Sequence, residues 1–242
     1  MKYEKNNIYN VDCYQAIKEI PDNSVDLVYT DIPYDISYEG AGCLSKNVSN
    51  NKKSMNKHRD TLLQGIDYSI LDEFVRICKK PYIYIWCSKN QILDIMNYFA
   101  KYKNMNSDIL VWAKDNPVPF GNRQFLSDLE YCLVFYEKGA KVHLGIEHKH
   151  KWYLSHLNTK DKKKYGHPTI KPLELVKNHI INSTNEGDCV LDCFMGSGTT
   201  CVACKETNRN YIGFELIPEY YDIAKKRLEE EKNDIFKYLE EE

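Results

Sequence analysis

Four residues able to do chemistry follow one another at the end of an apolar run, in the stretch YTDIPYD that begins at position 29. The run from Val25 to Tyr29 predicts a short buried strand, which should stop where the four begin. In open α/β sheets, ligands bind in the crevice outside the carboxyl ends of the strands. We therefore expect a ligand site that contains Asp31, Ile32, Pro33 and Tyr34.

A second stretch, CVLDCFMGSGTTCVAC from 189 to 204, has the pattern of a strand, a glycine turn and a helix. Gly196 and Gly198 let the backbone bend sharply and lie close to a ligand, and the small Cys201 lets the helix pack against the strand. The next predicted strand ends in Glu215, 17 residues after Gly198. A carboxylate there can accept hydrogen bonds from ribose hydroxyls, so these features together predict a nucleoside-binding pocket.

The pocket alone fits NAD, FAD or S-adenosyl-L-methionine, because all three contain a ribose. A dinucleotide site places a pyrophosphate at the helix N-terminus and prefers a third glycine. This loop has the hydroxyls of Ser197 and Thr199 instead. It also follows an Asp-x-Phe, made by Asp192 and Phe194, that can contact the methionine part or the adenine of a sulfonium cofactor. These differences favour S-adenosyl-L-methionine.

Seven apolar runs predict the strands that must position these residues, near 8, 25, 82, 108, 131, 189 and 210. Stretches with helical spacing lie between several of them, near 70, 92, 173 and 201. The alternation predicts an α/β fold, a mostly parallel sheet with helices on both faces. The strands near 108 and 131 can instead form an antiparallel hairpin at one edge.

The composition suits a cytoplasmic protein. The chain has 242 residues, a formal net charge of -2 and nine cysteines, an odd number that lies in apolar segments and suits a reducing compartment. Its apolar runs are too short to span a membrane, and the first residues lack the apolar core of a signal peptide. We expect one domain over 1–242 with a mobile loop at about 40–60.

With DIPY and DCFMGSGTT in this order, the chain resembles the amino-group DNA methyltransferases that modify adenine N6 or cytosine N4, in the permuted β class. In that family the catalytic tetrapeptide, usually Asp-Pro-Pro-Tyr, comes first and the Phe-x-Gly-x-Gly cofactor loop lies near the C-terminus. The resemblance extends from DCYQAIKEIP at 12 through HPTIKPLELV at 167 to NYIGFELIPEYYDIAKKRL at 210. It implies a Rossmann-like seven-stranded sheet in which the cofactor strand lies beside the DIPY strand.

The resemblance also implies roles for single residues. Asp12 matches the acid that contacts the adenine amino group of S-adenosyl-L-methionine, with the backbone of Cys13 beside it. Thr169 and Lys171 fall in the segment that approaches the methionine end. The remaining cofactor residues are expected to be Asp31, Asp192, Phe194, Gly196, Ser197, Gly198, Thr199 and the ribose acid Glu215.

The family mechanism compensates for a weak nucleophile, because the lone pair of an exocyclic amino nitrogen is delocalised into the ring. The Asp31 side chain and the carbonyl of the next residue would hold the amino group, and Tyr34 would stack on the flipped base. Ile32 replaces the first proline of the pattern, so the fixed φ is lost, although the carbonyl remains and Pro33 still favours extended backbone. Aspartate at the first position is associated with adenine N6. Cytosine C5 chemistry needs a cysteine nucleophile, usually after a proline, and the chain has no Pro-Cys pair.

Two lysine-rich segments are expected to contact the DNA backbone, the loop at 40–60 and a small target-recognition insertion at about 140–166. The candidate residues are Lys52, Lys53, Lys57, Arg59, Lys149, Lys151, Lys162, Lys163 and Lys164. The histidines between 143 and 156 are assigned to DNA contact rather than to a metal. Cys201 and Cys204 form a C-x-x-C, for which we expect helix packing rather than zinc.

Double-stranded DNA is the expected partner, and the resemblance leaves a homodimer and a cognate restriction endonuclease open. One alternative keeps the reaction and changes the acceptor to cytosine N4, RNA or a protein amide. A second is a nucleic-acid-binding subunit that keeps the cofactor pocket and has lost catalysis through Ile32. An NAD-dependent oxidoreductase comes last because it leaves DIPY unexplained.

Overall fold

The computed structural model describes residues 2–35, 65–117, 125–140, 143, 145, 149–167 and 169–240, the last ten by their backbone alone. Its strands are β1 (Asn7–Asn10), β2 (Leu27–Asp31), β3 (Tyr82–Cys87), β4 (Met105–Lys114), β5 (Leu129–Glu137), β6 (Trp152–Ser155), β7 (Cys189–Asp192) and β8 (Asn210–Glu215). Its helices are α1 (Cys13–Ala16), η1 (Ile17–Glu19), α4 (Ile70–Ile77), α5 (Ile92–Phe99), α6 (Thr159–Tyr165), α7 (Leu173–Ser183), α8 (Thr199–Glu206) and α9 (Pro218–Glu240).

The strands form one eight-stranded sheet in the order β1-β8-β7-β2-β3-β5-β4-β6. Only β5 runs antiparallel to its neighbours β3 and β4, and the other pairings are parallel. The predicted hairpin of β4 and β5 is therefore confirmed. Strand β7, which carries the glycine loop, lies beside β2, which carries DIPY, so segments far apart in sequence meet at one edge of the sheet.

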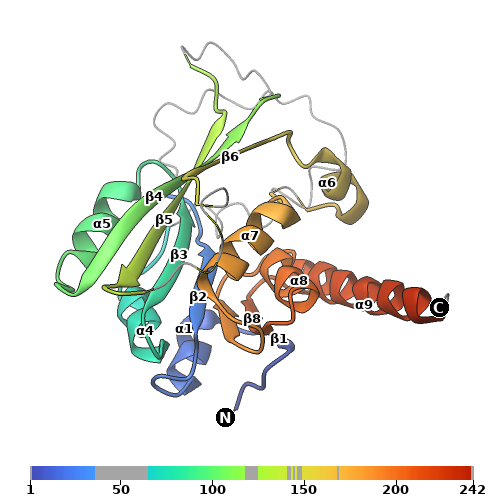
Figure 1. Ribbon diagram of the computed structural model, residues 1–242, viewed down its shortest axis with the longest axis horizontal. Coiled ribbons are helices and arrows are strands. Elements are labelled where there is room, and N and C mark those ends of the chain that lie inside the picture. Colours follow the sequence, from blue (N-terminus) through green and yellow to red (C-terminus); the bar gives the residue numbers. More distant parts are fainter. Residues whose placement is uncertain are drawn as a thin grey trace.

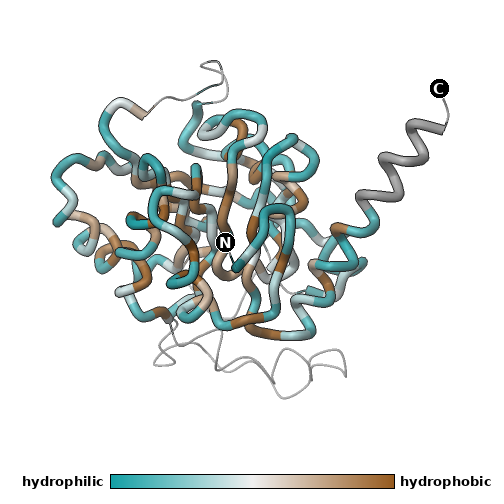
Figure 2. Tube along the Cα trace, turned by 90° about the horizontal axis from the view of Figure 1, so that it is seen from below, coloured by the Kyte–Doolittle hydropathy of each residue, from teal (hydrophilic) through white to brown (hydrophobic). Residues whose placement is uncertain are grey.

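Helices cover both faces of the sheet, with α1, α4 and α5 on one side and α7, α8 and α9 on the other (Figure 1). The central strand β3 is buried throughout because its residues alternate between the two layers. Ile83 and Ile85 pack in the cluster under α4 and α5, whereas Tyr84 and Trp86 pack in the cluster under α7 and α8. Figure 2 shows the resulting distribution, with hydrophobic segments inside and hydrophilic segments around them.

The sheet has one strand more than the predicted seven. The extra strand is β6, which pairs with β4 at the edge, and helix α6 follows it, so part of the segment assigned to target recognition is regular. Strand β6 has only four residues and alternates between exposed and half-buried side chains, so its short apolar sequence does not identify it as a strand. Among the described residues, no helix is long and apolar enough to cross a membrane.

Candidate active site

The tetrapeptide is held in place by strand β3 and the turn that follows it. Asp31, the last residue of β2, is in register with Trp86. The side chain of Gln91 donates from Nε2 to the Pro33 carbonyl at 2.9 Å and is itself almost wholly buried. These contacts fix the backbone of the tetrapeptide at Asp31 and at Pro33.

Ile32 substitutes for the family proline with a different restraint. Its backbone N–H donates to the Trp86 carbonyl at 3.1 Å, a bond that proline cannot make. Its side chain is 2% exposed and packs in the core with Ile83 and Ile85. A hydrogen bond to β3 and core packing thus replace the proline ring, and the departure from the family pattern does not leave this backbone unanchored.

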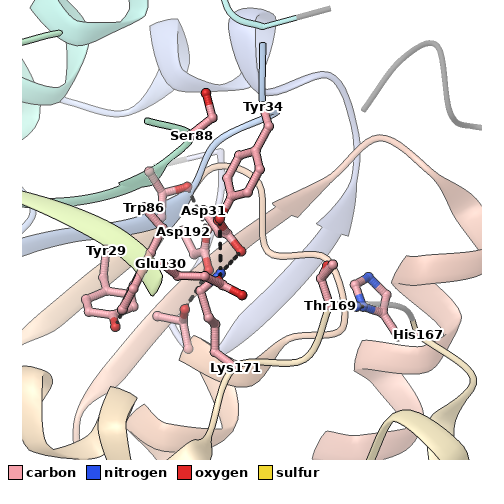
Figure 3. A network of polar contacts seen from close by, with 12 residues as sticks. Tyr29, Asp31, Tyr34, Trp86, Ser88, Glu130, His167, Thr169, Lys171 and Asp192 are labelled. Atoms are coloured by element: carbon pink, nitrogen blue, oxygen red, sulfur yellow. Dashed lines mark hydrogen bonds and ion pairs between the residues drawn. The ribbon is translucent and has the colours of Figure 1, made fainter. Parts of the chain in front are cut away.

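The two oxygens of the Asp31 carboxylate have different surroundings (Figure 3). Oδ2 accepts from Lys171 Nζ at 2.6 Å, whereas Oδ1 is buried and has no hydrogen-bond partner among the described residues. Burial raises the pKa of Asp31, and the nearby Lys171 ammonium opposes that rise. A buried acceptor without a partner is costly, so Oδ1 is suited to receive a donor from a ligand.

Lys171 is buried at the centre of a network of half-buried charged side chains. Its Nζ also lies 3.0 Å from Glu130 Oε2, and Glu130 Oε1 is paired with Lys114 Nζ at 2.6 Å. Burial alone would raise the pKa of Glu130, but the two lysines lower it to about 2. The sequence predicted Lys171 at the methionine end of the cofactor and did not predict its contacts with Asp31 and Glu130.

The glycine loop joins β7 to α8 and has the backbone that its glycines permit. Gly196 and Gly198 have φ values of 51° and 76°, in the left-handed region. The Gly196 N–H donates to Glu215 Oε2 at 2.8 Å, and the Ile217 N–H donates to Oε1 at 2.8 Å. Glu215 is therefore oriented by the loop beside it, and an ionised carboxylate accepts about four hydrogen bonds.

The buried side chain of Arg227 on α9 binds the same loop through hydrogen bonds. Its Nη1 donates to the carbonyl and the hydroxyl of Ser197 and to the hydroxyl of Thr199, at 2.8 to 2.9 Å. Ser197 and Thr199, predicted as cofactor residues, are thus both buried and both bound to Arg227. Their direct contact with the cofactor stays a prediction.

Asp192 ties together the elements that meet at the loop. Its Oδ1 accepts from the Thr30 hydroxyl at 2.9 Å and from the Phe194 N–H, and its Oδ2 accepts from the Thr200 hydroxyl at 2.6 Å. The side chain thereby connects β7 to β2 and α8. Asp192 therefore has a structural role at the start of the glycine loop. The predicted contact of Asp192 with the cofactor stays a prediction.

We expect the stability of the fold to depend on the protonation of Asp192. Burial, opposed by the hydroxyls of Thr200 and Thr30, raises the pKa of Asp192 from 3.8 to about 7. Because the folded state holds this proton more tightly, the protonated Asp192 side chain contributes to the free energy of unfolding. This contribution is complete below the unfolded pKa and is lost as the pH rises through about 7.

Thermal unfolding of Asp192→Asn beside the wild type measures this contribution. The Tm of the wild type should exceed that of Asp192→Asn by more at about pH 5 than at about pH 8. Asp222→Asn, on the exposed surface of α9, is the matched control and should show no such pH dependence. An equal difference in Tm at both pH values for Asp192→Asn would show that Asp192 is ionised throughout.

The other predicted cofactor residues gather around the ends of β1 and β8. Asp12 caps α1 by accepting from the Tyr14 N–H at 2.9 Å, two residues after Asn10, which pairs with Glu215. The Tyr14 ring meets the Phe194 ring edge-on at 6.3 Å between centroids. Cys13 is buried, and burial with the charges of Asp12 and Glu215 raises the pKa of its thiol. An acid and two aromatic rings thus lie beside the glycine loop.

Thr169 lies next to His167 (Figure 3). The Thr169 N–H donates to His167 Nδ1 at 3.3 Å, which leaves the ring hydrogen of the neutral imidazole on Nε2. That Nε2 is buried without a partner among the described residues, and it would lie 3.3 Å from a Cβ atom built on Gly196. A donor is therefore directed at the glycine loop, although the sequence did not single it out.

These residues fit S-adenosyl-L-methionine on observations of the chain itself. The glycine backbone admits close approach, Glu215 is oriented at the end of β8, and two buried polar atoms, Asp31 Oδ1 and His167 Nε2, lack partners in the described part of the chain. The Asp31 acceptor lies on the strand next to the loop. A ligand bound over the loop would thus reach both the ribose acid and the tetrapeptide.

The predicted DNA-binding lysines have varied surroundings. Lys52, Lys53, Lys57 and Arg59, with the loop at 40–60, lie outside the described residues. Lys151 pairs with Asp108, and Lys164 pairs with Glu230 on α9 at 2.8 Å. Lys162 is partly buried, and burial lowers its pKa. Lys149 and Lys163 are exposed, and contact of any of these residues with DNA stays a prediction.

The C-x-x-C cysteines are part of the core. Cys201 and Cys204 are fully buried on α8, and a Cβ atom built on Gly213 of β8 would lie 2.9 Å from Cys201 Sγ. This is the close packing of helix on strand that the sequence predicted. No group of three or more His, Cys, Asp or Glu side chains suited to a metal occurs in the described part of the chain.

A family model described as DNA methylase, of the N6/N4 type, matches residues 25–226. Among curated relatives, the Type II methyltransferase M.HinfI of Haemophilus influenzae is 33% identical over 95% of this chain and 71% of its own length. The Type II methyltransferase M2.MboI of Moraxella bovis is 28% identical over 93% of this chain and 88% of its own length.

Solved structures agree with these sequence relatives. M1.HpyAVI superposes with a TM-score of 0.67 at 28% identity, covering 92% of this chain and 98% of that one. Its SAM complex superposes with a TM-score of 0.61 at 29% identity, covering 91% and 98% of the two chains. The cytosine-N4-specific PvuII methyltransferase shares the fold, with a TM-score of 0.66 at 16% identity over 93% of this chain and 86% of that one.

Proposed function

The chain belongs to the N6/N4 DNA methylases, and we propose that it methylates the exocyclic N6 of an adenine flipped out of a specific site in double-stranded DNA. The observation that carries the choice of acceptor is the Asp31 carboxylate, with Oδ2 held by Lys171 and Oδ1 buried without a partner among the described residues. An amino group offers the hydrogens that this oxygen lacks.

S-adenosyl-L-methionine is the methyl donor of this family and supplies an electrophilic methyl group when bound. Asp31 Oδ1 and the Ile32 carbonyl would accept the two amino hydrogens at about 3 Å and direct the nitrogen lone pair at that methyl group. Asp31 would then receive the proton released from the nitrogen, a role that its raised pKa suits. Tyr34 would stack on the flipped base, contributing roughly 1 to 3 kcal/mol.

We assign the cofactor contacts as follows. Glu215 accepts from the ribose hydroxyls and Asp12 from the adenine amino group, beside the rings of Tyr14 and Phe194. The glycine loop supports the methionine part, with Thr169 and His167 beside it. Asp12 caps α1 two residues after Asn10, the strand residue that pairs with Glu215, and this arrangement supports the assignment.

We further propose that lysines of the insertion at 140–166 contact the DNA backbone, and the exposure of Lys149 and Lys163 supports this. The position of the chain among Type II methyltransferase relatives supports a cytoplasmic role in restriction-modification with a cognate endonuclease. A homodimer is also proposed, and a measurement of the molecular mass in solution by analytical ultracentrifugation tests it directly.

Methyl transfer from tritiated S-adenosyl-L-methionine tests the substrate. The acceptors are unmethylated duplex DNA, the same sequence as single-stranded DNA, and an RNA copy, followed by digestion and identification of the labelled nucleoside. We expect label in N6-methyladenine from duplex DNA. Label in N4-methylcytosine, or preference for RNA, would replace the proposed acceptor, and cofactor binding without transfer would favour a silent DNA-binding subunit.

A further inference from the structure

We propose that Glu130 is a positioning residue for the reaction, which acts through Lys171 on Asp31, with Lys114 balancing its charge. The inference rests on the proposed function, and it deepens that function by adding a residue from the antiparallel strand β5. The row Asp31, Lys171, Glu130 and Lys114 is called the charge row below. It was not recognised from the sequence, because its members lie on four separate segments.

The topology explains why these residues meet. Asp31 is the last residue of β2, and Lys114 is the last residue of β4. Strand β5 runs antiparallel to both neighbours, so Glu130, its second residue, lies at the edge where parallel strands end. Lys171 comes from the segment before α7 and lies between the two carboxylates, 2.6 Å from Asp31 and 3.0 Å from Glu130 (Figure 3).

Glu130 fixes the position of the Lys171 ammonium group. An ammonium group has three donors, and two of them are directed at Asp31 Oδ2 and Glu130 Oε2, with the Tyr34 hydroxyl at 3.5 Å. The Trp86 ring lies 4.9 Å below the same nitrogen. Without Glu130, Lys171 would have Asp31 as its single carboxylate partner within the charge row. It could then move toward Oδ1, the oxygen that the amino group needs.

The charge row also sets the charge state of Asp31. Its signs alternate from Asp31 to Lys114, so removal of one member leaves an unbalanced charge in a half-buried place, next to the buried Lys171 ammonium group. Burial raises the pKa of Asp31, the Lys171 ammonium group lowers it, and the Glu130 carboxylate raises it further. The other titratable groups that act on Asp31 or respond to it are Tyr29, Tyr34, Cys87, Cys132 and Asp192.

Glu130→Gln is the variant that tests this role, because glutamine keeps the shape and an acceptor oxygen. Glu137→Gln, at the other end of β5 and bonded to Asn104, is the matched control. We expect Glu130→Gln to lower kcat about tenfold or more, since small misplacement of reacting groups is costly. The Kd for S-adenosyl-L-methionine should stay within about twofold, because no cofactor contact is removed.

The pH dependence provides a measurement that a merely structural role would not change. Loss of the Glu130 charge should move the acid limb of kcat toward lower pH, by about one unit, while Lys171→Met should move it toward higher pH. Glu130→Asp, which restores the charge on a shorter side chain, should return the limb toward its wild-type position. Opposite shifts in the two variants follow only if both charges act on Asp31.

Carbon-13 NMR of the Asp31 carboxyl group measures the same shift without turnover, with Asp31→Asn used to assign the resonance. A lower pKa in Glu130→Gln would support the charge row even if the wild type methylated no DNA, in which case only the proposed function would fail. An unchanged pKa with unchanged kcat would overturn the proposal. Loss of cofactor affinity alone would instead return Lys171 to the methionine end. If Lys171→Met does not fold, Glu130→Gln decides alone.

Discussion

Asp31→Ala is expected to lower kcat for methyl transfer by about 10²-fold to 10⁴-fold or more, the range associated with a positioned acid or base. The variant removes the buried acceptor Oδ1 and the group that takes up the released proton. Binding of S-adenosyl-L-methionine should be largely retained, because the glycine loop and Glu215 are held by Arg227 and backbone bonds that do not involve Asp31. Turnover and equilibrium cofactor binding measure the two effects separately.

The fold should tolerate this substitution, since Lys171 keeps Glu130 as its partner and is not left as an isolated buried charge. Asp35→Ala is the matched control, because Asp35 is an exposed aspartate of the same short stretch. Its turnover should equal that of the wild type. If Asp31→Ala retained wild-type turnover, the tetrapeptide would not be the catalytic element, and another acceptor for the amino group would be needed.

Gly198→Ala is expected to have the largest effect on cofactor binding. Gly198 has φ +76°, and a Cβ atom there would lie 2.8 Å from the Cβ and 3.2 Å from the Cα of Ala224 on α9. The left-handed backbone costs about 1–2 kcal/mol, and the clash adds about 1–3 kcal/mol because α9 must shift. That shift would displace Arg227, three residues further along the same helix, so the Kd for S-adenosyl-L-methionine should rise at least about tenfold.

Gly139→Ala separates the two costs. Gly139 has a similar φ of +83°, but nothing lies within 4 Å of its added Cβ atom. This control should lose stability through its backbone alone and bind the cofactor as the wild type does. Calorimetry of both variants, with and without S-adenosyl-L-methionine, measures the comparison. Equal losses of stability and equal cofactor affinity in the two variants would show that contact with α9 does not set the loop.

Much of the fold was predictable because apolar runs and glycine turns act locally. All seven runs formed strands, and the stretches near 70, 92, 173 and 201 formed helices. The neighbouring positions of β2 and β7, which followed from the family resemblance, are confirmed. The eighth strand could not be predicted in this way, because β6 is short and half-exposed and depends on pairing with β4.

The side-chain partners were harder to predict than the strands. Glu130 and Lys114 become site residues only because β5 and β4 end or begin at the same edge, which a sequence pattern does not express. Gln91 lies in a turn after β3 and gave no motif. Lys171 was assigned from its place in a family segment. Its contact with Asp31 joins residues that are 140 positions apart in the sequence, so no local pattern could indicate it.

The most direct test is the content of methylated nucleosides in DNA from a bacterial host that expresses this chain and lacks adenine methyltransferases of its own. Mass identification of the digested nucleosides should detect N6-methyladenine with the wild type and none with Asp31→Ala at matched expression. N4-methylcytosine in place of N6-methyladenine would contradict the choice of base. N6-methyladenine at equal levels in the Asp31→Ala host would contradict the central role of that carboxylate.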